Sequence, residues 1–214
     1  TFVANWKDNS YIPIPPTQPT RPTRPAEPDE PDTPDEPDVP DEPDTPDVPA
    51  SDYADVQEDA WYAEAVDYVT AEGLMTGTTA DAFAPDVTTT RAMIWTILGR
   101  MSGASVSGGE PWYALAQSWA VSSGVSDGSD PDSKITREQL ARMLYAHAGT
   151  PAVSGDLNNF ADGAKVSNWA KDAVIWAKEK GVIKGKTVNG KLCIDPQGNA
   201  TRAEAATMMK NYLG

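Results

Sequence analysis

Apolar residues between positions 51 and 214 recur with the spacing of amphipathic helices, and the pattern occurs three times. In each set a first helix carries apolar residues at positions i, i+4, i+7 and i+8, and a glycine follows it. The sets are Trp61, Ala65, Tyr68, Val69 with Gly73; Trp112, Ala116, Trp119, Ala120 with Gly124; and Trp169, Ala173, Trp176, Ala177 with Gly181. Glycine accepts the left-handed conformation found just past a helix end, so we expect each helix to stop there.

A second amphipathic helix follows each first one, with apolar positions at i, i+3, i+4 and i+7. These positions are Ile94, Ile97, Leu98, Met101; Leu140, Met143, Leu144, His147; and Ala205, Met208, Met209, Tyr212. One pair of short helices cannot bury both of its apolar stripes, so three pairs should share one core. The prediction is a mainly α fold built from three helix-loop-helix units. In the third loop, Asn189-Gly190 favours a type I′ turn in a small hairpin.

The three sets follow one template: Trp, eleven residues, Gly, three residues, Gly, a loop of variable length, Pro, four residues and Thr-Arg. The copies are Trp61/Gly73/Gly77/Pro85/Thr90-Arg91, Trp112/Gly124/Gly128/Pro131/Thr136-Arg137 and Trp169/Gly181/Gly185/Pro196/Thr201-Arg202. Because only one gap changes length, this is an internal repeat. We expect copies at residues 51–103, 104–150 and 151–214.

The amino-terminal quarter has a different composition. Residues 13–50 carry Pro at every third position and eleven acidic residues against two arginines, which is a net charge of −9 out of −15 for the chain. Such a segment cannot bury a core, and the spacing fits polyproline II, so it should form a disordered or semi-rigid stalk. Residues 1–12 alternate apolar and polar residues like the last strand of a β-rich upstream domain, or form a leader. The chain should be the tail of a larger exported protein.

Charge and composition exclude several partners and cofactors. The acidic balance gives no footprint for nucleic acid, and no apolar run is long enough for membrane insertion. Cys193 is the only cysteine, so an intrachain disulfide or a multi-cysteine metal site is not possible. We therefore expect neither a cofactor nor a bound metal.

The starts of the second helices carry capping signals. Thr201 with Glu204, and Thr136 with Gln139, fit the reciprocal capping box, whereas Thr90 is followed at the same distance by Met93. These threonines and Glu204 are therefore helix caps beside any site.

The arginine after each threonine is not explained by helix formation, because a cation at the first helical position opposes the helix dipole. Arg91, Arg137 and Arg202 nevertheless occupy this position in all three copies. Beside free helix N-terminal amides, a guanidinium could grip a carboxylate or phosphate. The alternative is a salt bridge to an acidic residue of a neighbouring repeat, and the residues alone do not separate the two.

The tryptophans allow two interpretations as well. Trp169 and Trp176 share a helical face, which favours core positions. Trp61 and Trp112 lie near helix starts and could cover a sugar ring at the edge of the core. The candidate ligand-binding residues are Arg91, Arg137, Arg202, Trp61, Trp112, Trp169, Gly77, Gly128 and Gly185.

Taken together, the Trp-to-Gly spacing, Phe83-Ala84-Pro85 and Thr201-Arg202-Ala203-Glu204 resemble the S-layer homology family over residues 51–214. The resemblance implies a pseudo-three-fold spindle with a central helical bundle, whose grooves between repeats bind secondary cell-wall polysaccharide, often pyruvylated. It implies non-covalent anchoring at a Gram-positive-type cell wall or S-layer, and it gives the arginines a ligand carboxylate to bind.

The copies depart from the family pattern to different extents. Copy one reads Thr-Arg-Ala-Met and copy two Thr-Arg-Glu-Gln. Copy two also lacks the aromatic residue and aspartate that open the others, Tyr53 with Asp55 and Phe160 with Asp162. The grooves should therefore differ, with copy three the most complete.

Other functions have weaker support in the residues. The only histidine, His147, falls on an apolar helix face, which favours a structural role over catalysis, and we expect no enzyme activity. The loop Asp127–Glu138 has acids at its first and twelfth positions, as calcium loops do, but Pro and Asp at its fifth and sixth. A calcium-dependent protein-docking module, or S-layer self-assembly with other S-layer proteins, is the alternative function.

Overall fold

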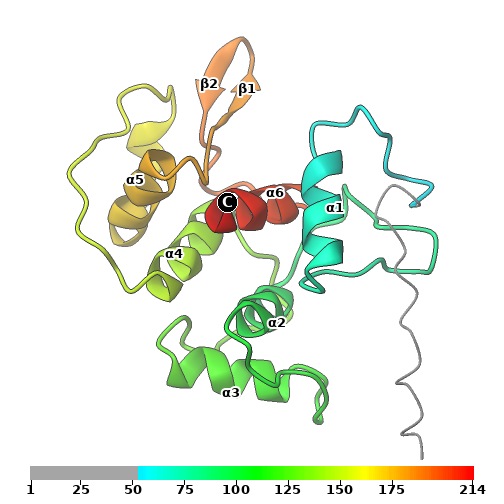
Figure 1. The fold of residues 1–214 in the computed structure, drawn as a ribbon. Helices are drawn as coiled ribbons and strands as arrows, with labels where there is room; N and C mark the ends of the chain where they lie inside the picture. Colours follow the sequence, from blue (N-terminus) through cyan, green and yellow to red (C-terminus); the bar gives the residue numbers. More distant parts are fainter. Residues whose placement is uncertain (1–52) are drawn as a thin grey trace, which may run out of the picture. The chain divides into compact units, whose positions relative to one another are not determined.

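A computed structural model describes residues 53–214, so the expectations for the leader and the proline-rich stalk lie outside the described residues. The described part is mainly helical, as predicted (Figure 1). Its helices are α1 (Ala63–Ala71), α2 (Arg91–Met101), α3 (Ala114–Ser122), α4 (Arg137–His147), α5 (Lys171–Glu179) and α6 (Arg202–Leu213). Two 3-10 turns (Gly163–Lys165 and Asn168–Ala170) precede α5, and strands β1 (Lys186–Val188) and β2 (Lys191–Cys193) lie between α5 and α6.

The first helices end as the sequence predicts. Gly73, Gly124 and Gly181 follow α1, α3 and α5 with φ of 62°, 72° and 72°, in the left-handed region. The apolar residue after each glycine turns back into the core, so Leu74, Val125 and Val182 are all buried.

The second helices begin at the predicted caps. The side chains of Thr90, Thr136 and Thr201 each accept a hydrogen bond from the backbone N–H three residues later. The complete capping box forms at Thr136 and Thr201, and only the threonine half forms at Thr90, because Met93 has no acceptor to return. In α2, α4 and α6 the first three predicted apolar positions are buried, and the fourth is partly buried.

Each first helix packs against a second helix of another pair. Helix α3 lies against α2, α5 against α4, and α1 against α6, so the last helix of the chain closes onto the first (Figure 1). In Figure 1 helices α2, α4 and α6 lie on the inside, with α3, α5 and α1 on their outer sides. None of the helices in residues 53–214 has the length and apolarity needed to cross a bilayer.

A closed ring of three backbone hydrogen bonds ties the three pairs together just before the second helices. Thr89 N donates to Ala200 O (2.9 Å), Ala200 N to Ile135 O (2.9 Å), and Ile135 N to Thr89 O (3.0 Å). All three residues are fully buried, so each bond is shielded from water. Each ring residue immediately precedes a capping threonine, which places the starts of α2, α4 and α6 around one point.

The hairpin predicted in the third loop is present. Strands β1 and β2 pair antiparallel, with Val188 opposite Lys191. Asn189 and Gly190 connect them with φ of 50° and 73°, and two consecutive positive φ angles are what a type I′ turn requires.

Candidate functional site

The three arginines link neighbouring helix pairs through one repeated contact. Each Nε donates to the carbonyl oxygen of the residue two positions before the proline of another pair's loop. The bonds are Arg91 to Ser129 (2.8 Å), Arg137 to Ile194 (2.8 Å) and Arg202 to Phe83 (2.7 Å). An arginine at this position therefore has a structural role whether or not a ligand is bound.

The helix N-terminal amides beside these arginines are not free, and that expectation is wrong. The same proline loops accept hydrogen bonds from the first two N–H groups of each second helix. In α6, Arg202 N donates to Val87 O (2.8 Å) and Ala203 N to Pro85 O (2.9 Å), and α2 and α4 repeat the pattern. An anion would have to bind through side chains instead.

The arginines differ in their acidic partners. Arg91 Nη2 lies 2.6 Å from Asp127 Oδ1, and Arg137 Nη1 lies 3.0 Å from Glu204 Oε1. Arg202 has no carboxylate within ion-pair distance among residues 53–214. Instead its Nη2 donates to Thr76 O (2.6 Å), and its guanidinium lies over the ring of Phe83. Burial lowers the pKa of Arg202 from its usual range.

Each arginine lines one of three grooves, and every groove takes residues from all three helix pairs. In each groove, one helix pair contributes the arginine and another contributes an exposed tryptophan. The remaining pair contributes residues of its second helix and of the segment that leads to the second glycine of the template. We name the grooves after their arginines. The Arg137, Arg91 and Arg202 grooves have volumes of about 540, 270 and 210 Å³.

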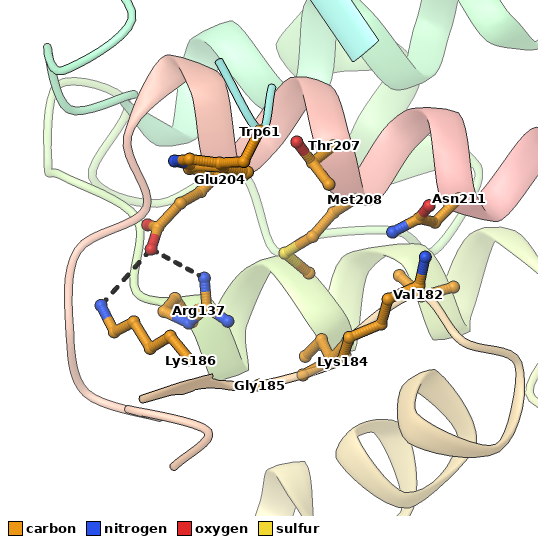
Figure 2. A pocket seen from close by; sticks show the side chains of 11 residues that line it. Trp61, Arg137, Val182, Lys184, Gly185, Lys186, Glu204, Thr207, Met208 and Asn211 are labelled. Carbon is orange, nitrogen blue, oxygen red and sulfur yellow. Dashed lines mark hydrogen bonds and ion pairs between the residues drawn. The ribbon is translucent and has the colours of Figure 1, made fainter. Parts of the chain in front are cut away.

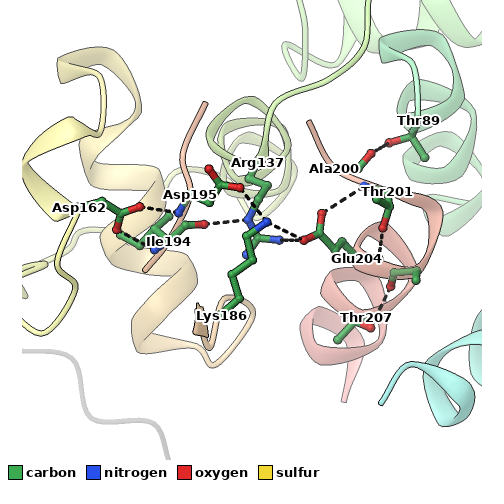
Figure 3. Close-up of polar contacts among 11 residues, drawn as sticks. Thr89, Arg137, Asp162, Lys186, Ile194, Asp195, Ala200, Thr201, Glu204 and Thr207 are labelled. Carbon is green, nitrogen blue, oxygen red and sulfur yellow. Dashed lines mark hydrogen bonds and ion pairs between the residues drawn. The ribbon is translucent and has the colours of Figure 1, made fainter. Parts of the chain in front are cut away.

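The Arg137 groove is the largest of the three and has more charged side chains than either of the others. Trp61 lies across it from Lys184, Gly185 and Lys186 (Figure 2). Glu204 Oε1 accepts from Arg137 and from Lys186 Nζ (3.3 Å). Lys186 Nζ also lies 2.7 Å from Asp195 Oδ2. The network therefore bridges the hairpin loop to α6 (Figure 3).

The other two grooves repeat this arrangement with different side chains. The Arg202 groove is lined by Trp112 and Gly77, and by Arg100, whose Nη1 donates to Leu74 O (3.0 Å). The Arg91 groove is lined by Trp169, Asp127 and Arg142. Of the three candidate glycines, Gly77 lines the Arg202 groove and Gly185 lines the Arg137 groove. Gly128 does not line the Arg91 groove, where the first glycine of that copy, Gly124, is found instead.

The three tryptophans that line grooves precede their helices and point outward. Trp61, Trp112 and Trp169 are 67%, 51% and 55% exposed. The predicted core position of Trp169 is therefore wrong: it lies in a 3-10 turn, outside the helical register that buries Trp176. Exposed indoles at groove margins are suited to covering sugar rings.

Two of the glycines are needed for close packing. A Cβ at Gly77 would lie 2.6 Å from Tyr53 Cε1, and one at Gly185 would lie 2.6 Å from Phe160 Cε1. Gly77 N also donates to the hydroxyl of Tyr53 (2.8 Å). In copies one and three, the opening aromatic residue therefore packs on the glycine that lines a groove.

Aspartates that sequence reasoning did not include in the site hold the proline loops. The carboxylate of Asp55 accepts from Phe83 N (2.8 Å) and Ala84 N (2.7 Å). Asp162 does the same for Ile194 N and Asp195 N (Figure 3). The sequence signal that could have identified these aspartates is that one opens copy one and one opens copy three, whereas copy two has none.

In copy two, Asp127 takes over part of that role. Its Oδ1 accepts from Ser129 N (3.0 Å), and Ser129 is the equivalent of Phe83 and Ile194. Hydrogen bonds from Ser129, with a smaller effect of Arg91, lower the pKa of Asp127, so this carboxylate is ionised. One side chain thus holds the loop and neutralises the groove arginine.

The remaining candidates have structural partners. Asp127 binds Arg91, while Glu138 is buried and accepts from Ser167 N (2.9 Å) and Ser167 Oγ (2.8 Å), so the two end carboxylates of the calcium-like loop serve separate contacts. Within residues 53–214, no three His, Cys, Asp or Glu side chains cluster to hold a metal ion. His147 is partly buried, with its ring nitrogens bonded to Ser102 Oγ and Tyr212 Oη, in agreement with the predicted structural role.

Comparison with known proteins finds one matching family profile and several similar proteins. The S-layer homology domain profile matches residues 52–92 and 159–206, and neither range reaches the second helix pair. The Surface-layer 125 kDa protein of Lysinibacillus sphaericus is 30% identical over 77% of this chain and 15% of its own length. The amylopullulanase of Thermoanaerobacterium thermosulfurigenes is 28% identical over 73% of this chain and 9% of its own. The S-layer protein of Bacillus thuringiensis subsp. finitimus is 26% identical over 72% and 20%. The chain thus spans a small part of each of these relatives.

Proposed function

Because its matches at residues 52–92 and 159–206 make this chain a member of the S-layer homology family, we propose that it anchors an exported protein to the bacterial cell wall by binding secondary cell-wall polysaccharide. S-layer homology domains are binding and anchoring modules, so the chain itself has no enzymatic task in this proposal. Its relatives include both surface-layer proteins and an amylopullulanase. A shared anchoring module attached to different cargoes accounts for that mixture.

The proposal places the polysaccharide in the three grooves of a pseudo-three-fold spindle formed by copies at 51–103, 104–150 and 151–214. One observation carries it: in every groove an exposed tryptophan and a guanidinium converge from different helix pairs. The indole covers a sugar ring, and cationic side chains bind an acidic substituent such as a pyruvyl ketal. Because the chain has a net charge of −15, attraction must be local.

The same proposal covers the rest of the chain and its location. Residues 13–50 would be a stalk that crosses the wall layer, and residues 1–12 the end of an upstream domain or a leader. The protein would act outside the cell, at the wall or S-layer of a Gram-positive-type bacterium. Its S-layer relatives support this location.

Co-sedimentation of the 214-residue chain with purified Gram-positive sacculi, before and after chemical removal of the secondary polysaccharide, tests the proposal. The best probes are Trp61→Ala, Trp112→Ala and Trp169→Ala, because these exposed side chains can be removed without opening the core. Val188→Ala, at an exposed hairpin position, is the control. We expect pelleting that depends on the polysaccharide and weakens in the tryptophan variants. Equal pelleting with intact and stripped walls would refute polysaccharide binding.

A further inference from the structure

The residue immediately before the second glycine of the template differs in charge among the three copies. It is Thr76 in copy one, Asp127 in copy two and Lys184 in copy three. Each of these residues lines a different groove: Thr76 the Arg202 groove, Asp127 the Arg91 groove and Lys184 the Arg137 groove. One template position therefore gives the three grooves a neutral, a negative and a positive side chain.

The Arg91 groove is lined by two arginines, Arg91 and Arg142, and the carboxylate of Asp127 is paired with Arg91. Nη1 of Arg142 is buried and has no hydrogen-bond partner among residues 53–214. Asp127 Oδ1 lies 2.6 Å from Arg91 Nη2, and the pKa of Asp127 is lowered, so the carboxylate stays charged. A carboxylate that bound Arg91 would have to displace Asp127 and remain beside it. Two like charges at such close range oppose binding. Asp127 also accepts a hydrogen bond from Ser129 N, and this bond fixes the carboxylate relative to the loop.

In the Arg137 groove, the charge is reversed. The carboxylate of Glu204 is shared by Arg137 and Lys186 and also caps Thr201 N (3.1 Å). Lys184 is exposed, and within residues 53–214 its ammonium makes no hydrogen bond or ion pair. Its charge is therefore available to a ligand.

The Arg202 groove is intermediate between the other two in the charge at this template position. No carboxylate lines it, but both of its guanidinium groups bind backbone carbonyls, Arg202 at Thr76 O and Arg100 at Leu74 O. Thr76 itself adds no charge. No lining carboxylate opposes an anionic ligand here, although it also finds no uncommitted cation among these side chains.

We infer that the residue before the second glycine tunes how tightly each groove binds an acidic sugar: Lys184 strengthens binding in the Arg137 groove, Asp127 weakens it in the Arg91 groove, and Thr76 adds no charge to the Arg202 groove. This inference rests on the proposed function and adds a rule for selectivity within it. The polysaccharide would then be held in one direction, because its acidic residues are bound with different affinities in different grooves.

Ligand binding can be measured in each groove separately, because each groove has its own tryptophan. Indole N–H signals of Trp61, Trp112 and Trp169 report on the Arg137, Arg202 and Arg91 grooves and can be assigned with single Trp→Phe variants. The probes are the methyl glycoside of an N-acetylhexosamine bearing a 4,6-pyruvyl ketal, and the same compound with its carboxylate methyl-esterified. The two probes differ only in charge, apart from one methyl group.

With the acidic probe, we expect the charges of Lys184 and Asp127 to change Kd at Trp61 and Trp169 in opposite directions, each by about tenfold, a size set by one nearby charge. Asp127→Asn keeps the acceptor for Ser129 N and should tighten binding at Trp169 about tenfold. Lys184→Gln should weaken binding at Trp61 by a similar factor and leave Trp112 unchanged. The esterified probe should respond to neither variant.

The outcomes separate the selectivity rule from the proposed function. If the acidic probe shifts all three indoles with one Kd, and Asp127→Asn changes nothing, the rule is wrong while groove binding stands. If neither probe shifts any of the three indoles, groove binding of sugars is wrong, and the rule fails with it.

Discussion

The Nε atom of Arg202 donates a 2.7 Å hydrogen bond to the carbonyl oxygen of Phe83, across 119 residues of sequence. The same guanidinium lies with Cζ 4.5 Å from the centre of the Phe83 ring. This contact joins the last helix of the chain to the first proline loop. Arg91 and Arg137 make the equivalent carbonyl contact between the other pairs, so the arginines hold the grooves together as well as line them.

Replacing Arg202 with lysine should destabilise the fold. Lysine cannot reach the carbonyls of Phe83 and Thr76 with a planar fork, and leaving one buried acceptor unpaired should cost about 1–3 kcal/mol. Urea unfolding of the full chain, followed by tryptophan fluorescence, measures the loss. Lys180→Ala removes an exposed charge and serves as the control. Equal midpoints for the two variants would contradict a structural role for Arg202.

That prediction affects how binding experiments are designed. Loss of wall binding in Arg202→Ala would not distinguish a missing ligand contact from a loosened groove, because the guanidinium is buried and bound to two backbone carbonyls. The exposed tryptophans and Lys184 are better probes, since they can change without leaving a buried group unpaired, and Asp127→Asn keeps the acceptor for Ser129 N.

The helix caps should differ in their contributions. Thr201→Ala removes the side-chain acceptor of a complete capping box and should cost about 1 kcal/mol. Thr90→Ala should cost less, because Met93 leaves the box half formed. Thr201→Ser keeps the hydroxyl and should stay within a few tenths of a kcal/mol of the parent. Unfolding midpoints in urea give the order, and a Thr201→Ser variant as unstable as Thr201→Ala would exclude capping as the cause.

Local sequence signals determine the elements of this fold, but not the grooves. Helix ends at Gly73 and starts at Thr201 depend on residues within a few positions, so they were predicted correctly. The partner of Arg202 lies more than a hundred residues away and is a backbone carbonyl, which no side-chain pattern encodes. The mixing of three helix pairs in each groove likewise follows from the cyclic packing of α1 on α6, which sequence spacing does not show.

The tryptophans show a second limit of periodicity. Trp61, Trp112 and Trp169 extend the apolar spacing of α1, α3 and α5 backward, so they match a helical face in the sequence. The helices begin only at Ala63, Ala114 and Lys171, and the residues before them leave the helical path. A repeated residue just outside a helix can therefore be a surface feature even though it matches the core pattern.

The second glycine of copy three should tolerate alanine less well than the first. Gly181 and Gly185 both have positive φ, 72° and 83°, so alanine carries a similar backbone penalty of about 1–2 kcal/mol at each. A Cβ at Gly181 meets nothing within 4 Å, whereas one at Gly185 would lie 2.6 Å from Phe160 Cε1 and 3.0 Å from Cys193 O. Gly185→Ala should therefore cost about 1–3 kcal/mol more, the usual range for overpacking. Differential scanning calorimetry of the two variants compares them, and equal melting temperatures would show that Phe160 relaxes freely.

Stability should fall between about pH 7 and pH 5.5 because of His147. Ser102 Oγ donates to Leu98 O (3.0 Å), so it accepts from Nε2, which leaves Nδ1 to accept from the Tyr212 hydroxyl. This arrangement needs the neutral imidazole, and burial lowers its pKa below the ordinary value near 6.5. As pH falls through 6.5, the unfolded chain binds a proton that the native state resists.

The free energy of unfolding should therefore decrease with acid, with a slope of at most about 1.4 kcal/mol per pH unit for one proton. His147 is the only histidine, so urea unfolding of the His147→Gln chain over the same pH range is a direct control. The variant should be less stable at pH 7.5, because it loses two hydrogen bonds, and should show little dependence on pH down to 5.5. A parent protein whose stability rises as pH falls through this window would show that the native state favours the charged imidazole, contrary to the hydrogen bonding described here.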